Sequence, residues 1–219
     1  MTPASTTDPE APRDCPLCPR LTAYRAENAA REPAWYNGPA PSFGPADARL
    51  LVVGLAPGRT GANRTGRPFT GDYAGDLLYG TLLKLGLARG VYAADPEDGL
   101  SLVGAMITNA VRCAPPENKP TPAEIATCRP YLAARIATLR HLRAVVALGA
   151  IAHDSVLRVH GLKPSAARFG HGVETSLGGP VRMFSSYHCS RYNTQTRRLT
   201  AAMFEDVLTK ARQWAFAPP

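Results

Sequence analysis

The chain has 219 residues, of which 45% are hydrophobic, and a formal net charge of +8 at pH 7. This size and composition indicate one globular domain with a sizeable core and exclude a fibrous or mainly disordered protein. The first residues, MTPASTTDPEAPRD, hold no apolar segment typical of a secretory signal, and no run of about 18 apolar residues could span a membrane. We therefore expect a cytoplasmic protein. Its basic charge favours a polyanion such as nucleic acid as partner, although a solvated basic surface has the same charge.

Apolar runs and helical spacing predict strands that alternate with helices along the chain. The first 14 residues are rich in Pro, Thr and Ala and are expected to be disordered, whereas residues 15–219 form a single domain. Strands are predicted at residues 49–54, 105–113, 143–149 and 180–188, and helices at 18–31, 75–87, 121–139, 150–160 and about 199–211. Pro130 predicts a kink or a break in its helix.

Strands that alternate with helices are joined by crossovers, which place helices on both faces of a parallel sheet. The sequence therefore predicts an α/β protein with a three-layer αβα fold and a central, mostly parallel four-stranded sheet. Binding sites in such sheets lie at the carboxyl ends of the strands. The segments that follow the four strands are GLAPGRTGANRTGRPFTGD, TNAVRCAPP, GAIAH and SYHCSRYNTQTRR, all unusual in composition.

Four of the five cysteines form a candidate metal site. Cys15 and Cys18 make a C-x-x-C motif, and Cys113 and Cys128 lie far downstream with 14 residues between them. In a reducing compartment cysteines serve as ligands or free thiols more often than as disulfides. Four thiolates suit zinc or a [4Fe–4S] cluster, and the prolines beside them favour iron–sulfur slightly. Four unrelated thiols are the alternative, and Cys189 is not expected to be a ligand.

Four motifs, GLAPG, NRTGRPFTGD, TNAVRCAPPENKPTP and SYHCSRYNTQT, resemble in sequence and order those of the iron–sulfur uracil-DNA glycosylases, most closely the type 5 enzymes. The resemblance runs from Cys15 into the last helix. It implies a DNA repair enzyme that hydrolyses the bond between uracil and deoxyribose and leaves an abasic site. It also implies a [4Fe–4S] cluster on the four cysteines, and further deaminated bases such as hypoxanthine and xanthine as substrates.

The sequence differs from that of the related type 4 enzymes at one position. Those enzymes carry an acidic residue directly after the first glycine of the motif, where this chain has Leu55 followed by Ala56. Leu55 at this position fits the type 5 enzymes, and the chain therefore lacks the acidic residue that other uracil glycosylases use in catalysis. Two alternatives therefore stay open: a non-catalytic, metal-stapled DNA-binding module, and a type 4-like glycosylase specific for uracil.

The resemblance and the chemistry of base excision together indicate five residues for the reaction. Phe69, on a turn between glycines, presents a ring on which a flipped base stacks, and the amide of Asn109 matches the edge of uracil. His188 faces O2 of the leaving base and stabilises the developing anion. Asp72 either orients the water or only caps the next helix, and Asn63 is a second candidate for holding the water. Without the resemblance, Phe69, Asn109 and His188 would be interpreted as structural residues.

The remaining candidates bind backbone groups of the substrate. The N–H groups of the GLAPG turn, at Gly54, Ala56 and Gly58, are suited to a phosphate or to the base. A side chain of the SRYNTQTRR loop is expected to enter the duplex where the base leaves, although a solvated basic loop would look the same. The candidates for DNA binding are Arg64, Arg67, Ser190, Arg191, Tyr192, Asn193, Gln195 and Arg197. We expect a monomer that binds double- and single-stranded DNA and no membrane.

Overall fold

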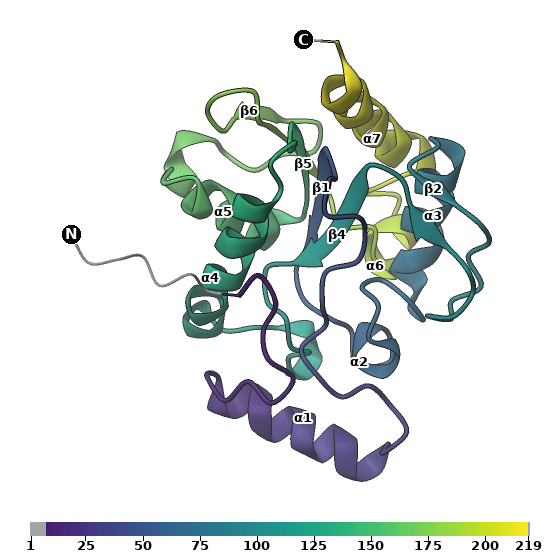
Figure 1. The fold of residues 1–219 in the computed structure, drawn as a ribbon, viewed down its shortest axis with the longest axis vertical. Coiled ribbons are helices and arrows are strands. Elements are labelled where there is room, and N and C mark those ends of the chain that lie inside the picture. Colours follow the sequence, from purple (N-terminus) through teal and green to yellow (C-terminus); the bar gives the residue numbers. More distant parts are fainter. Residues whose placement is uncertain (1–7, 219) are drawn as a thin grey trace.

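A computed structural model describes residues 8–218 as an α/β domain built on a five-stranded sheet (Figure 1). The strand order is β4-β1-β5-β7-β6. Four strands are parallel, namely β1 (Leu50–Gly54), β4 (Ala105–Asn109), β5 (Ala144–Leu148) and β7 (Arg182–Ser186). The edge strand β6 (Glu174–Ser176) is antiparallel to β7. The predicted αβα fold with a mostly parallel sheet is confirmed, and the fifth strand is an addition.

Helices cover both faces of the sheet. In Figure 1, α3 and α7 lie on one side of the sheet and α4 and α5 on the other, while α1 lies at one end of the molecule. The α-helices are α1 (Pro19–Arg31), α2 (Ala62–Thr65), α3 (Tyr73–Lys84), α4 (Pro122–Thr138), α5 (Ala150–Val159), α6 (Arg191–Gln195) and α7 (Ala201–Phe216). The 3₁₀ turns are η1 (Pro116–Asn118) and η2 (Pro164–Ala166), and a second small sheet pairs β2 (Ala88–Arg89) with β3 (Ser101–Leu102).

The alternation of side chains along β1 explains why its sequence is apolar throughout. Leu50 and Val52 pack in the core that includes α3 and α7, whereas Leu51 and Val53 pack in the core beneath α4 and α5. Successive side chains of a strand point to opposite faces, so a strand covered on both faces is apolar at every position.

Local signals set the helix ends. Thr121 accepts a hydrogen bond from the N–H of Glu124, and the Glu124 carboxylate accepts one from the N–H of Thr121, which is a complete capping box. Pro130 does not end α4, which continues through it to Thr138. The strand predicted to reach residue 113 ends at Asn109, although Ala110 still donates to the Gly54 carbonyl at 2.9 Å.

The predicted disordered tail is only partly within the described residues, because residues 1–7 lie outside them. Within residues 8–14, Glu10 accepts hydrogen bonds from Arg112 and Arg135, and it also accepts one from the N–H of Ser42 at 3.1 Å. This short segment is therefore in contact with the domain. Over the described part of the chain, the helices are too short or too polar to cross a bilayer.

Candidate active site

A pocket of about 460 Å³ opens at the carboxyl ends of the parallel strands. It takes residues from the loop after β1, the first turn of α3, the end of β4, and the segment between β7 and α6. Its lining consists of Leu55, Ala56, Pro57, Gly58, Arg59, Thr60, Phe69, Asp72, Tyr73, Ala74, Asn109, Asn118, His188, Ser190 and Arg191. Eight of the residues predicted from the sequence are among them: Ala56, Gly58, Phe69, Asp72, Asn109, His188, Ser190 and Arg191.

Phe69 and Asn109 meet directly above Gly54. A Cβ atom on Gly54 would lie 2.4 Å from the Asn109 Oδ1 and 2.5 Å from the Phe69 Cζ. Gly54 therefore contributes to the pocket by leaving space, since both side chains occupy the volume that a side chain of its own would need. The Asn109 Oδ1 is buried and has no hydrogen-bond donor among the described residues. Such an orphaned acceptor beside a pocket is typical of a group whose partner is a ligand.

His188 lies beside Phe69. The two rings stack with their centroids 5.9 Å apart and an angle of 26° between their planes. Burial lowers the pKa of His188 to about 4, so the imidazole is neutral at neutral pH and carries one N–H. The amide Nδ2 of Asn193 donates to the His188 carbonyl at 2.8 Å, which fixes the backbone that carries the ring. Asn193, predicted to bind DNA, thus supports His188 from within the protein.

Asp72 is the one carboxylate among the described residues that line the pocket. Its Oδ1 accepts the N–H of Gly75 at 3.2 Å and so caps α3. Burial raises the pKa of Asp72, against the hydrogen bonds from the N–H groups of Gly75 and Ala74, which lower it. The other oxygen, Oδ2, lies close to the loop after β1, 3.2 Å from where a Cβ atom on Gly58 would be. The two predicted roles are therefore compatible, because one oxygen caps the helix while the side chain lines the pocket.

The turn after β1 offers backbone donors to the same pocket. The N–H groups of Ala56 and Gly58 have no acceptor among the described residues, and both residues line the pocket. They can bind an anion or a water molecule.

Two predicted residues lie away from the pocket. The Asn63 side chain is buried, its Nδ2 donates to Oδ1 of Asn37 at 3.1 Å, and it does not line the pocket. The Arg67 side chain is 4% exposed and forms an ion pair with Asp98. Its assignment to DNA binding is corrected, because a buried guanidinium with a buried partner cannot contact a phosphate outside.

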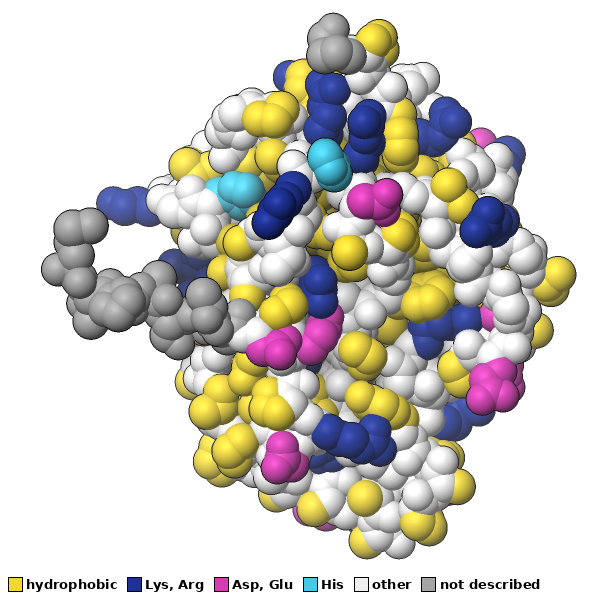
Figure 2. Space-filling view, viewed as in Figure 1, with side chains coloured by type: hydrophobic (Ala, Val, Ile, Leu, Met, Phe, Trp, Pro, Cys, Tyr) yellow, Lys and Arg dark blue, Asp and Glu magenta, His cyan; other side chains and the backbone are white. Residues whose placement is uncertain are grey.

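Of the other predicted DNA contacts, Ser190 and Arg191 line the pocket. Ser190 caps α6 by accepting the N–H of Asn193 at 3.4 Å. The Arg191 guanidinium lies 5.2 Å from the centre of the Tyr73 ring, and Tyr192 is 70% exposed. Arg64, Arg191, Tyr192, Gln195 and Arg197 are all exposed. On the face drawn in Figure 2, basic side chains are spread out rather than gathered in one patch.

Several pocket residues were not predicted from the sequence. Asn118 has a positive φ of 56° and lies within the quoted motif TNAVRCAPPENKPTP, which was the available signal. Thr60 and Tyr73 also line the pocket, but each looks like an ordinary loop or helix residue in the sequence.

The four candidate metal ligands lie together on one side of the domain. Cys15, Cys18, Cys113 and Cys128 line one small cavity with Leu21, Val111 and Tyr131. Arg25 donates to the Cys113 Sγ at 3.4 Å, and the N–H of Arg112 donates to the Cys128 Sγ at 3.2 Å. Burial raises the pKa of Cys113 to about 12 and that of Cys128 to about 11.

The four thiols form a donor set of the kind that zinc or an iron–sulfur cluster takes. Within residues 8–218, no three His, Cys, Asp or Glu side chains are spaced to hold a single metal ion, although the four thiols surround a common cavity. Cys189 is separate from them, since it packs in the core between the sheet and α3, with its Sγ 3.5 Å from the Ala74 carbonyl.

Comparisons with known proteins show the family to which the chain belongs. The family described as Uracil DNA glycosylase superfamily matches residues 41–212. A type-5 uracil-DNA glycosylase of Thermus thermophilus is 47% identical over 207 residues, which cover 92% of this chain and 94% of that protein. A type-5 uracil-DNA glycosylase of Mycobacterium tuberculosis is 46% identical, covering 92% of this chain and 78% of that protein. A type-4 uracil-DNA glycosylase of Pyrobaculum aerophilum is 34% identical, covering 68% and 62%. The chain belongs to the uracil DNA glycosylase superfamily.

Proposed function

We propose that this protein is a DNA repair glycosylase that hydrolyses the N-glycosidic bond of uracil in DNA and leaves an abasic site. The observation that carries the proposal is the convergence of Phe69, Asn109 and His188 in one pocket, in a chain of this superfamily. These three residues supply a stacking surface, an amide for the base edge, and a donor for the leaving base.

Base binding starts with extrusion of the nucleotide from the duplex, because the glycosidic bond is not accessible inside the stack. The flipped base stacks on Phe69, and stacking of a base on an aromatic ring contributes about 1–3 kcal/mol. The Asn109 amide can donate to O4 of uracil and accept from N3–H. The Asn109 Oδ1 has no donor among the described residues, which supports its role as the acceptor for N3–H.

As the glycosidic bond breaks, charges of opposite sign develop on the sugar and on the base. The sugar develops oxocarbenium character, which the Asp72 carboxylate stabilises by its charge, and uracil leaves as an anion. His188 is neutral, so its N–H donates to O2 of uracil as negative charge builds there. The free N–H groups of Ala56 and Gly58 are suited to hold the attacking water or a flanking phosphate. Water then adds to the sugar carbon, and the proton that it releases neutralises the uracil anion.

We further propose that the specificity extends to other deaminated bases, such as hypoxanthine and xanthine. Stacking on Phe69 does not depend on which base is stacked, since every base has an aromatic face. The type 4-like alternative predicts a uracil-only enzyme, and the non-catalytic alternative predicts DNA binding without base release.

One assay separates these functions. Purified protein is incubated with duplexes that carry uracil, hypoxanthine or thymine at one labelled position, and the free base is measured. Release of uracil supports the proposal, and release of hypoxanthine supports the wider specificity. Binding of all three duplexes without release of any base would overturn the enzyme assignment.

We propose a [4Fe–4S] cluster on Cys15, Cys18, Cys113 and Cys128, with zinc as the less favoured alternative. The cluster would supply no step of the hydrolysis and would join the segment before α1 to the loop after β4 and to α4. Cys128→Ser should lose iron and visible absorption and should lower the melting temperature. Cys189→Ala is the matched control, because Cys189 is also buried but should leave the iron content unchanged. A parent protein that carries zinc and no iron would overturn the cluster.

We propose that the protein acts as a cytoplasmic monomer on double- and single-stranded DNA. The exposed arginines Arg64, Arg191 and Arg197 would displace counterions from the phosphates, so affinity should fall steeply as salt rises. Arg191→Ala should weaken duplex binding more than single-strand binding if this side chain fills the gap left by the base. Equal losses on both substrates would count against that role.

A further inference from the structure

Phe69 carries its ring into the pocket from a backbone conformation that aromatic residues rarely adopt. Its φ is +55°, in the left-handed region that favours glycine. A conformation of this kind persists only where the surrounding structure strongly fixes it. The groups that hold Phe69 in place are therefore part of how the pocket is built.

Two stacked tyrosines hold the peptide groups on either side of Phe69. The Tyr79 hydroxyl donates to the Pro68 carbonyl at 2.6 Å, and the Tyr92 hydroxyl donates to the Phe69 carbonyl at 3.1 Å. Their ring centroids are 4.6 Å apart. Burial raises the pKa of both phenols, that of Tyr92 to about 12, so both keep the proton that they donate.

A glycine makes the close approach of these groups possible. A Cβ atom on Gly75 would lie 1.9 Å from the Phe69 carbonyl oxygen and 2.2 Å from the Tyr92 hydroxyl oxygen. The first turn of α3 therefore packs against the same two atoms that the hydrogen bond joins. Because Asp72 caps this turn, the helix start and the Phe69 backbone are fixed together.

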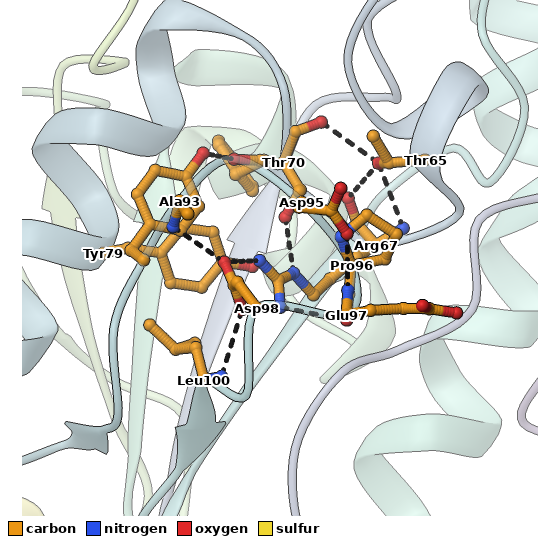
Figure 3. A network of polar contacts seen from close by, with 12 residues as sticks. Thr65, Arg67, Thr70, Tyr79, Ala93, Asp95, Pro96, Glu97, Asp98 and Leu100 are labelled. Carbon is orange, nitrogen blue, oxygen red and sulfur yellow. Dashed lines mark hydrogen bonds and ion pairs between the residues drawn. The ribbon is translucent and has the colours of Figure 1, made fainter.

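A buried ion pair joins the two segments that carry these groups (Figure 3). The Arg67 guanidinium donates to both carboxylate oxygens of Asp98, each at 2.8 Å, and its Nε donates to Thr70 at 2.7 Å. Asp98 also accepts the N–H groups of Ala93 at 2.9 Å and Leu100 at 3.0 Å. The ion pair thus fastens the loop after β2, which carries Tyr92, to the turn that carries Phe69.

The Arg67 guanidinium also packs over aromatic rings, with its Cζ 5.4 Å from the centre of the Tyr79 ring and 5.9 Å from that of Tyr92. Of the described residues that line the pocket, none is Arg67, Tyr79, Tyr92 or Asp98. These four side chains can therefore influence a bound base only through the turn that they hold.

We propose that Arg67, Asp98, Tyr79 and Tyr92 form a turn clamp that fixes Phe69 where its ring stacks on the flipped base. The clamp consists of positioning residues, and this role rests on the proposed glycosylase function. In this proposal Arg67, the arginine of the GRPF motif, stabilises the turn inside the protein and does not contact DNA.

The test uses Tyr92→Phe, which keeps the stacked ring and removes only the hydroxyl that holds the Phe69 carbonyl. Uracil release is measured in single turnover with saturating enzyme. The rate should fall about fivefold to tenfold, the size expected for one neutral hydrogen bond, while the melting temperature falls by only about 2–4 °C and the protein stays folded. Tyr24→Phe, at a half-buried tyrosine of α1, is the matched control and should retain the parental rate.

A double-mutant cycle shows whether the effect passes through Phe69. In a Phe69→Ala background, Tyr92→Phe should cause no further loss, because no ring is left to position. The same fold loss in both backgrounds would overturn the clamp, and so would a parental rate for Tyr92→Phe. Tyr79→Phe repeats the cycle on the neighbouring carbonyl if Tyr92→Phe does not fold.

Failure of the proposed function can be distinguished from failure of the clamp. If the parent protein releases no uracil, the glycosylase assignment fails, whatever the variants do. The clamp is then tested by affinity for a duplex with 2′-fluorodeoxyuridine, whose bond resists cleavage, against a thymidine duplex. Tyr92→Phe should reduce the preference for the fluorinated site, and an unchanged preference would overturn the clamp.

Discussion

The rings of Phe69 and His188 stack with an offset, with a centroid separation of 5.9 Å and an interplanar angle of 26°. This separation is that of two rings in contact, so it leaves no room for a base between them. A flipped base must therefore use the free surface of Phe69, and His188 must approach its edge. This arrangement suits a donor that acts on the leaving base and not a second stacking surface.

His188 should matter for the rate and little for DNA affinity. Charge builds on O2 of uracil only as the bond breaks, so a donor there contributes most in the transition state. Loss of one such donor costs about 10²–10³ in rate in a well-studied protease. His188→Ala should lower single-turnover cleavage by a similar factor while duplex affinity stays near the parental value. His141→Ala, at an exposed histidine, is the control. Parental cleavage by His188→Ala would remove this residue from the mechanism.

The lowered pKa of His188 also predicts a pH dependence of stability. The ring has a pKa of about 4 in the folded protein against 6.5 ordinarily, so between these values the unfolded chain binds more protons. The stability that His188 contributes is fully present above about pH 6.5 and is lost as the pH falls towards 4. The melting temperature should therefore drop over this range, and His188→Gln should make the drop smaller.

Two other histidines limit the size of that change. Burial also lowers the pKa of His160 and of His171, so part of the slope should remain in His188→Gln. Melting curves of parent and variant between pH 4 and 7 provide the measurement. Identical slopes would mean that the pKa of His188 is not lowered in the folded protein.

Strands and helices with strong local patterns were predictable from the sequence, and non-local pairs were not. The run RLLVVG predicts β1 because a strand covered on both faces is apolar at each position. In contrast, β6 has three residues and no apolar pattern, and only its pairing with β7 makes it a strand.

The same contrast holds in the pocket. Phe69 and His188 are indicated by long motifs, and both line it. The burial of Arg67 depends on Asp98, which is 31 residues away in a different loop, so the sequence shows only an arginine in a glycine-rich turn. Charge in such a turn is equally consistent with a DNA contact and with an internal ion pair, and the three-dimensional contact decides between them.

Asp72 caps α3 and also supplies a negative charge to the pocket, and two substitutions separate these two contributions. Asn caps helices about as well as Asp, so Asp72→Asn should keep the stability and lose the charge that stabilises the sugar cation. Asp72→Ala should also lose about 1 kcal/mol of unfolding free energy with the cap. If both variants cleave at the parental rate, the carboxylate acts only on the helix. Single-turnover rates and denaturant melts of the two proteins measure the two effects separately.

Gly54 should be essential for activity because of the space that it leaves. A Cβ atom there would lie 2.4 Å from the Asn109 Oδ1 and 2.5 Å from the Phe69 Cζ. Both obstructing atoms are at the ends of side chains, so the fold can adjust by moving them at modest cost. The pocket cannot keep its shape when these two side chains move, because both of them face the base. Gly54→Ala should therefore keep the melting temperature near that of the parent and lower single-turnover cleavage about 10²-fold, as misplacement by about 1 Å does in other enzymes.

Gly80 supplies the matched control for this substitution. It is exposed in the middle of α3, and a Cβ atom there would meet nothing within 4 Å. Gly80→Ala should raise the unfolding free energy by up to about 1 kcal/mol, because alanine favours a helix over glycine, and should leave cleavage unchanged. A Gly54→Ala protein as active as Gly80→Ala would show that Phe69 and Asn109 can move without loss of function, and that neither needs its observed position for base excision.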